Sequence, residues 1–199
     1  EALNCKEDAT STSPLLARLY EHRRRVMHVM VDQGLHCIGS NFIFNRNQQL
    51  LVLGCGLDTS YEEQFGHLVK VVHVDLPEIA KKHDSGNGSG SRVISADLRD
   101  LDLLEAALTS ALFSFDADTV ILTEMVLNYL PLENVQNLLS FLSFNLSGQA
   151  IFLSYDLVGD ISCPSLYTRA LCGKFSERGA PLLSVSTNRA AQRKLYCSS

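Results

Sequence analysis

The sequence predicts a doubly wound α/β domain built on a mostly parallel β-sheet. Short apolar runs, typical of strands that are buried on both faces, recur along the chain. Segments with helical spacing lie between these runs, and right-handed crossovers then place helices on both faces of the sheet. Because ligands of such sheets bind at the carboxyl ends of the strands, the residues that follow each run are the candidate functional residues.

The spacing of apolar residues identifies each helix and strand in turn. An amphipathic helix is expected first, and each later helix follows a strand across a short connection. We expect strands over residues 49–54, 69–74, 92–95, 118–123 and 149–155, and helices over residues 13–33, 76–83, 102–112 and 132–145. One domain, 1–199, is predicted, with an N-terminal helical segment (1–48), a cofactor-binding core (49–156) and a shortened C-terminal part (157–199).

Composition excludes several classes of protein. The 199 residues include 17 basic and 22 acidic side chains, and this net charge of −5 argues against a general polyanion-binding protein. The apolar runs are far shorter than the ~20 residues that span a bilayer, and the polar N-terminus has no signal-peptide core, so we expect a cytoplasmic protein. The six cysteines form no CxxC pair, and neither zinc nor another metal is expected.

The first two strands are followed by residues that suit a ribose-bearing cofactor. Gly54-Cys55-Gly56 allows a tight turn and close approach of a ligand to the backbone. Asp75 ends the second strand, where a carboxylate can accept hydrogen bonds from the vicinal hydroxyls of a ribose. A plain strand-to-helix turn at the glycines and a helix N-cap at Asp75 are the structural alternatives.

The third and fourth strands are followed by further carboxylates. Asp97 can accept a hydrogen bond from the exocyclic amine of adenine, or it can cap the next helix. Glu124 needs a cation or several donors if it is buried, and the ammonium group of an amino acid is one such cation. An internal arginine partner is the alternative for Glu124. Thr59 stands where a GxGxxG dinucleotide motif needs its third glycine, so S-adenosylmethionine fits the series better than NAD.

Four segments in order resemble the leucine carboxyl methyltransferase family. They read LLVLGCGLDTS, VVHVDLPEIAKKH, VISADLRDLDLLEAAL and ILTEMVLNYLPLENVQNLLSFL, against family patterns GaGxDT, VDfPe, aDLRdl and aEavLxYl. The resemblance implies the class I S-adenosylmethionine-dependent methyltransferase fold. It also implies a set of cofactor contacts at Gly54, Cys55, Gly56, Asp75, Leu76, Asp97, Leu98, Glu124 and Met125.

The resemblance further implies an arginine that engages a carboxylate of the cofactor or of the substrate. Arg18-Leu-Tyr-Glu-His-Arg23 is similar to the family's RGYxxR segment, with leucine in place of glycine. Arg18 is then a cofactor contact, and Arg23 and Tyr129 are the candidate catalytic residues. In the alternative register, residues 7–20 match an earlier family segment, whose lysine is missing here.

The resemblance implies methylation of the C-terminal leucine carboxylate of the protein phosphatase 2A catalytic subunit. A relative that methylates the wybutosine base of tRNA and an inactive cofactor-binding paralogue are the alternatives. The family adds an antiparallel hairpin after the fifth strand, and this chain lacks it, being either a fragment or a shortened paralogue. We therefore expect residues 149–155 to form an incompletely covered sheet edge, and methyl transfer to be weak or absent.

Overall fold

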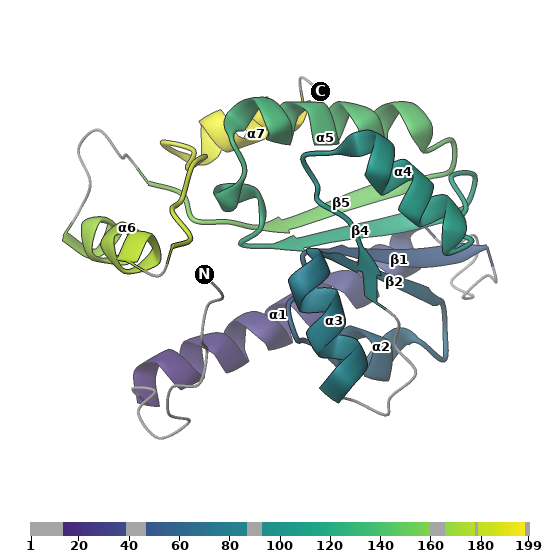
Figure 1. Cartoon of the computed structure of the whole chain (residues 1–199), viewed down its shortest axis with the longest axis horizontal. Coiled ribbons are helices and arrows are strands. Elements are labelled where there is room, and N and C mark those ends of the chain that lie inside the picture. Colours follow the sequence, from purple (N-terminus) through teal and green to yellow (C-terminus); the bar gives the residue numbers. More distant parts are fainter. Residues whose placement is uncertain (1–13, 39–46, 87–92, 160–165, 178, 198–199) are drawn as a thin grey trace.

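The fold is a single five-stranded parallel sheet covered by helices on both faces (Figure 1). The computed structural model describes residues 14–38, 47–86, 93–159, 166–177 and 179–197. The strands lie in the order β3-β2-β1-β4-β5, and every pair is parallel. They are β1 (Gln48–Leu53), β2 (Lys70–Asp75), β3 (Val93–Ser95), β4 (Asp118–Glu124) and β5 (Ala150–Tyr155). The predicted α/β architecture is confirmed, and strand order reverses between β1 and β4.

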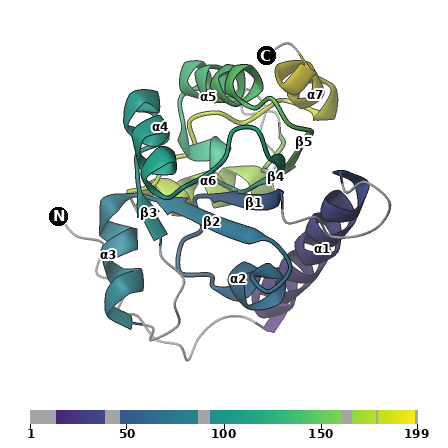
Figure 2. The ribbon, with the colours of Figure 1, turned by 90° about the vertical axis from the view of Figure 1, so that its right-hand side faces the viewer.

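Helices cover the two faces of the sheet in two groups. Figure 2 shows α1, α2 and α3 below the sheet and α4, α5 and α7 above it. The bounds are α1 (Pro14–Ile38), α2 (Ser60–Phe65), α3 (Pro77–Gly86), α4 (Leu101–Ser110), α5 (Leu132–Asn145), α6 (Leu166–Glu177) and α7 (Arg189–Cys197), with a 3-10 helix η2 (Leu127–Tyr129) after β4. None of the described helices combines the length and the apolar character that a bilayer-spanning segment requires.

The strand sequences explain the two cores. Successive side chains of β1 point to opposite faces, so Leu50 and Val52 pack towards α1 and α2, whereas Leu51 and Leu53 pack towards α4 and α5. All six residues of β1 are buried. A central strand that is apolar on both faces is typical of a parallel sheet between two helical layers, and it fixes the position of the glycine turn that follows.

Several elements differ from the prediction. Helix α1 extends to Ile38, because Val31, Leu35 and Ile38 continue its apolar stripe against the sheet. Helix α2 was missed because its six residues are too few to show a helical period. Helices α6 and α7 lie in the C-terminal part, for which no helix was predicted.

The C-terminal segment packs against β5 only in part. Among the described residues, β5 pairs with β4 alone, and its middle four residues are half-buried. The Tyr196 ring of α7 contacts the Phe152 ring of β5, with centroids 5.6 Å apart. Leu183 remains 53% exposed. Among the described residues, the middle of β5 is therefore partly covered. Leu166 and Leu171, two further apolar residues of the C-terminal part, have side chains outside the described residues.

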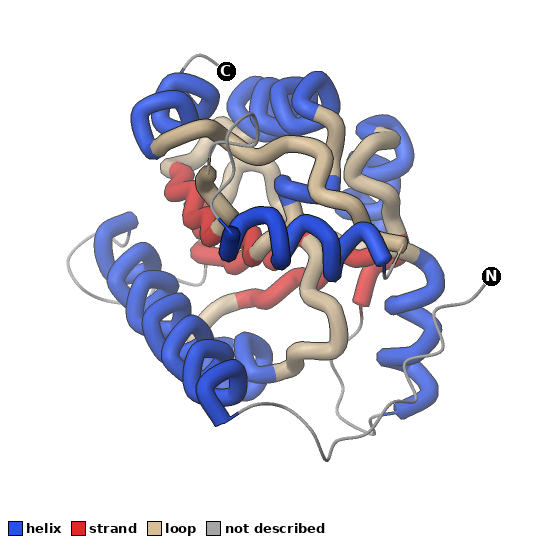
Figure 3. Tube along the Cα trace, turned by 90° about the vertical axis from the view of Figure 1, so that its left-hand side faces the viewer, coloured by secondary structure: helices blue, strands red, loops and turns tan. Residues whose placement is uncertain are grey.

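Helix α6 lies beyond the carboxyl ends of the strands (Figures 1 and 3). Its Phe175 ring meets the Tyr129 ring of η2 edge-on, with centroids 6.0 Å apart. The C-terminal segment therefore reaches the same end of the sheet as the candidate functional residues.

Candidate functional site

A small cavity lies at the carboxyl ends of β1 and β4, where strand order reverses. Its volume is about 210 Å³. We call it the switch-point cavity, and its lining residues are Arg23, Val52, Gly54, Cys55, Gly56, Asp58, Tyr61, Leu122 and Glu124. This is the position at which open parallel sheets bind their ligands.

The glycine turn after β1 forms one wall of this cavity. Gly54 and Gly56 have φ angles of +72° and +59°, which L side chains rarely adopt. A Cβ on Gly54 would lie 2.3 Å from the Val126 side chain, whereas a Cβ on Gly56 would meet nothing within 4 Å. Gly54 therefore permits close packing inside the protein, and the open space for a ligand lies at Gly56.

Asp75, at the end of β2, is joined directly to this turn. Its Oδ2 accepts a hydrogen bond of 2.7 Å from the Gly56 N–H, and its Oδ1 accepts one of 2.7 Å from the Leu76 N–H. An ionised carboxylate has about four acceptor positions, so capacity remains for ligand hydroxyls. The Asp75 carboxylate therefore links the ends of the first two strands, a contact that the sequence did not predict.

The opposite wall carries an arginine and a glutamate that face each other. The Nε atom of Arg23 lies 3.1 Å from Oε2 of Glu124, and both side chains are largely buried. The Tyr61 hydroxyl donates a hydrogen bond to Oε1 of the same carboxylate. An internal arginine partner for Glu124, one of the two alternatives from the sequence, is therefore present.

Arg23 still has unused capacity to donate. Its Nε is buried without a hydrogen-bond partner among the described residues, because the approach to Glu124 lacks hydrogen-bond geometry. The guanidinium also lies over two aromatic rings, 5.1 Å from the Tyr20 centroid and 5.8 Å from the Tyr155 centroid. The cavity therefore presents one positive and one negative group side by side, complementary to a zwitterion.

The environment of Cys55 keeps its thiol neutral. Burial, assisted by the nearby Asp75 carboxylate, raises the pKa of Cys55 to about 12. A protonated thiol is a small apolar lining group with low nucleophilicity. Cys55 is therefore a wall of the cavity rather than a reactive group.

Some predicted site residues lie outside the cavity. The Arg18 side chain is exposed and does not line it, so Arg23 is the arginine of this segment that reaches the site. Leu76 is exposed, and the Leu98 side chain is buried in the α4–α5 core. A contact between Leu98 and a ligand would have to use its backbone, because core packing fixes the side chain.

Asp97 and Tyr129 have partners within the protein. The Arg99 guanidinium holds both oxygens of Asp97 at 2.5–3.0 Å, and this pairing lowers the pKa of the Asp97 carboxyl. The Tyr129 ring packs against Phe175 of α6, and Tyr129 does not line the switch-point cavity.

Met125 shapes the chain just after Glu124. It has a φ of +61°, an uncommon value for any residue other than glycine, and its N–H donates to the Tyr155 carbonyl at 2.6 Å. This turn directs the chain from the end of β4 into η2. Its structural role is to place Glu124, and its side chain is half-buried.

The sequence did not reveal three other residues near the site. Tyr61 and Asp58 line the cavity, and the Asp58 carboxylate accepts a 2.8 Å hydrogen bond from the Ser60 N–H at the start of α2. His28 of α1 contacts Ser60 and packs on Tyr61. All three depend on α2, whose brevity hid it from the pattern of apolar residues.

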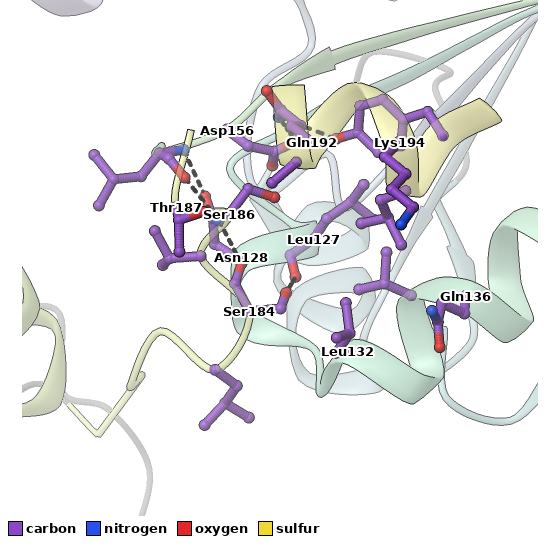
Figure 4. A pocket seen from close by; sticks show the side chains of 17 residues that line it. Leu127, Asn128, Leu132, Gln136, Asp156, Ser184, Ser186, Thr187, Gln192 and Lys194 are labelled. Atoms are coloured by element: carbon purple, nitrogen blue, oxygen red, sulfur yellow. Dashed lines mark hydrogen bonds between the residues drawn. The ribbon is translucent and has the colours of Figure 1, made fainter. Parts of the chain in front are cut away.

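A larger cavity, of about 460 Å³, lies on the other side of the sheet, between η2, α5 and α7 (Figure 4). Figure 4 shows Asp156 and Gln192 at one end and Leu132 and Gln136 at the other. Oδ2 of Asp156 accepts hydrogen bonds from the Tyr196 and Ser154 hydroxyls, and burial raises the pKa of this carboxyl. The lining of this cavity includes neither Asp75 nor the glycine turn.

No cluster of three or more metal-ligating side chains occurs in the part of the chain that the structure describes. The site's charged groups are those of Arg23, Asp58 and Glu124, with Asp75 beside them. The chemistry of the cavity is therefore that of hydrogen bonding and charge pairing.

The family model of leucine carboxyl methyltransferases matches residues 29–143, more than half of the chain and all of the strands from β1 to β4. This chain belongs to the leucine carboxyl methyltransferase family. The family match also confirms the resemblance carried by the four sequence segments. No curated protein matches the chain.

Solved structures share the fold of this leucine carboxyl methyltransferase family member. A protein from Thermobifida fusca, named for an inferred methyltransferase activity, superposes with a TM-score of 0.61 at 20% identity, covering 85% of this chain and 64% of its own. LepI in complex with SAM superposes with a TM-score of 0.53 at 11% identity, covering 97% of this chain and 43% of its own. A pericyclic reaction enzyme superposes with a TM-score of 0.55 at 12% identity, covering 97% of this chain and 44% of its own.

These likenesses show the fold alone. A methyltransferase-like protein and a pericyclic reaction enzyme both occur among them, so the fold does not determine the reaction. The chain spans about two thirds or less of the length of each of these proteins.

Proposed function

We propose that this chain binds S-adenosylmethionine at the switch-point cavity and catalyses transfer of its methyl group to a carboxylate. The acceptor that we propose is the C-terminal leucine of the protein phosphatase 2A catalytic subunit. Family membership supports the reaction class. The observation that carries the proposal is the juxtaposition of the Asp75-linked glycine turn with the Arg23–Glu124 pair at the reversal of strand order.

The cavity residues fit the amino-acid end of the cofactor. The buried Nε of Arg23 lacks a hydrogen-bond partner among the described residues, and a cofactor carboxylate would satisfy it. Glu124 offers its negative charge to an α-ammonium group. The open space at Gly56 admits the ligand beside the backbone, and Asp75 retains acceptor positions for the ribose hydroxyls.

S-adenosylmethionine supplies a methyl group on a positively charged sulfur. A leucine carboxylate is already ionised near neutral pH, so no general base is required. The protein has to hold the acceptor oxygen in line with the methyl group and to exclude water. Arg23 reaches the cavity and is our candidate for contact with the carboxylate of the cofactor. Tyr129 lies beyond the cavity, in η2, and is our candidate for supporting the acceptor.

A labelled methyl group tests this proposal. The protein is incubated with S-adenosylmethionine carrying a radioactive methyl group and a peptide that ends in leucine. The matched control is the same peptide with its terminal carboxylate amidated. We expect label only in the free-acid peptide, released by mild base because the product is a methyl ester. Label in both peptides would refute carboxyl transfer, and label in neither would refute the activity of this chain.

The same experiment tests whether the short C-terminal part lowers the rate of methyl transfer. We expect a lower rate than that of a longer family member assayed beside it, because incomplete cover of β5 admits water near the acceptor. Equal rates in the two proteins would contradict that expectation while leaving the proposed reaction in place.

A further inference from the structure

Tyr61 joins the glycine turn to Glu124. The residue follows the turn in the sequence and occupies the first half of α2, and only 2% of it is exposed. Its hydroxyl donates to Oε1 of Glu124, while Oε2 of the same carboxylate faces Arg23 at 3.1 Å. The two carboxylate oxygens thus have different partners, one from α2 and one from α1.

The Tyr61 ring is itself held by α1. The His28 ring packs against it, with centroids 4.6 Å apart and an interplanar angle of 48°. Nε2 of His28 lies 2.9 Å from the Ser60 hydroxyl, next to Tyr61 in α2. Contacts from α1 therefore reach Glu124 by two routes, directly through Arg23 and indirectly through His28 and Tyr61.

We propose that Tyr61 is a positioning residue that sets the orientation of Glu124 and thereby the recognition of an α-amino acid group on an adenosyl ligand. This inference rests on the proposed cofactor site. By occupying Oε1, the Tyr61 hydroxyl fixes the carboxylate plane and leaves Oε2 beside Arg23, at the place where we expect the ligand's ammonium and carboxylate groups.

The chemistry of Tyr61 suits this role. Burial and the hydrogen bond to Glu124 raise the pKa of the Tyr61 hydroxyl far above its usual value, so it remains a donor at every physiological pH. A hydrogen bond to a charged acceptor is stronger than one between neutral groups, and it restricts the carboxylate rotamer. The effect should be confined to ligands that place a charged group beside Glu124.

Two adenosyl ligands separate positioning from general support of the fold. S-adenosylhomocysteine carries the amino-acid group, and methylthioadenosine has the same nucleoside and sulfur without it. Calorimetry measures both affinities for the wild type and for Tyr61→Phe. We expect Tyr61→Phe to lower the affinity for S-adenosylhomocysteine roughly 10- to 100-fold and to change the affinity for methylthioadenosine by less than about 3-fold.

A matched control comes from the opposite side of the sheet. Tyr196 also donates its hydroxyl to a largely buried carboxylate, that of Asp156, at 2.8 Å. Tyr196→Phe removes an equivalent hydrogen bond without touching the switch-point cavity, so we expect it to change both affinities by less than about 3-fold. A second measurement uses Glu124→Gln: in that background, Tyr61→Phe should cause little further loss, because the two groups act through one contact.

The outcomes distinguish failure of the inference from failure of the proposed function. If the wild type binds both ligands, and Tyr61→Phe weakens both equally or neither, Tyr61 does not position Glu124. Independent, additive losses from Tyr61→Phe and Glu124→Gln would overturn the inference in the same way. If the wild type binds neither ligand, the proposed cofactor site is wrong, and the inference falls with it.

Discussion

At the residue scale, the site depends on charges brought together from distant parts of the chain. Arg23 lies on α1 and Glu124 at the end of β4, yet their side chains meet beside the glycine turn. The sequence indicated both residues but left two arginines open. Arg23 reaches the cavity and Arg18 does not, because the two project differently from α1 and Arg18 stays exposed.

We predict different effects of the same substitution at these two arginines. Arg23→Lys should weaken binding of S-adenosylhomocysteine about 10-fold, since lysine lacks the planar fork that pairs with a carboxylate. Arg18→Lys should change the affinity by less than about 2-fold and serves as the matched control. Calorimetry measures both; equal losses in the two variants would contradict the placement of Arg23 in the binding site.

A second residue-scale prediction concerns Gly54. Gly54→Ala should lower the free energy of unfolding by about 2–4 kcal/mol, because the new Cβ would be strained at φ +72° and would lie 2.3 Å from Val126. Urea unfolding measures the change. Gly173→Ala, on α6 where a Cβ meets nothing within 4 Å, should be neutral or stabilising. Equal destabilisation by the two changes would contradict this account of the turn.

Sequence spacing predicted Gly54, Gly56, Asp75 and Glu124 because each follows a strand of clear apolar character. It could not predict that Asp97 pairs with Arg99 or that Leu98 enters the core. Those outcomes depend on side-chain directions within a loop, which have no period. Tyr61 was missed for a related reason, since its contact with Glu124 joins two elements that are distant in the sequence.

At the element scale, β2 carries a polar residue within its buried part. His73 is 1% exposed, and neither ring nitrogen has a hydrogen-bond partner among the described residues. Its Nε2 lies 3.8 Å from a carboxylate oxygen of Glu62 on α2. Burial, with a smaller contribution from the nearby His83, lowers the pKa of His73 to about 4.

This histidine should make the fold sensitive to acid. Because the folded-state pKa is depressed, the unfolded chain binds a proton first as the pH falls below about 6.5, and stability declines until about pH 4. The full loss is on the order of 3 kcal/mol. Urea unfolding measures the free energy of unfolding between pH 7 and pH 4. His73→Leu should make this free energy decline less steeply with falling pH, and His67→Leu, at an exposed position, should leave the decline unchanged. An unchanged decline in His73→Leu would contradict the assignment.

The sequence predicted strands better than helices. The strands are apolar on both faces and bounded by polar turns, so all five begin and end within one residue of the predicted ranges. Helix α2 is too short to show a period. Helix α7 was missed because its nine residues are mostly polar and only Leu195 and Tyr196 pack against the α4–α5 core. In α6, the side chains that the structure describes are exposed or half-buried, so they give little apolar pattern.

At the scale of the whole molecule, the order of strands explains where the site lies. Crossovers from β1 run in one direction to β2 and β3, and the chain then returns to β4 and β5 on the other side of β1. Loops that leave β1 and β4 therefore diverge, and the switch-point cavity opens between them. The apolar pattern predicted parallel strands, and the residues that follow them favoured S-adenosylmethionine over NAD independently of the family motifs.

The most direct test of the central claim is calorimetric titration of the whole chain with S-adenosylhomocysteine, for the wild type and for Asp75→Ala. We expect the wild type to bind and Asp75→Ala to bind roughly 10- to 150-fold more weakly, through loss of the ribose contact. Asp102→Ala, at an exposed position on α4, is the control and should bind as the wild type does. Absence of binding by the wild type, or unchanged affinity in a folded Asp75→Ala variant, would contradict the account.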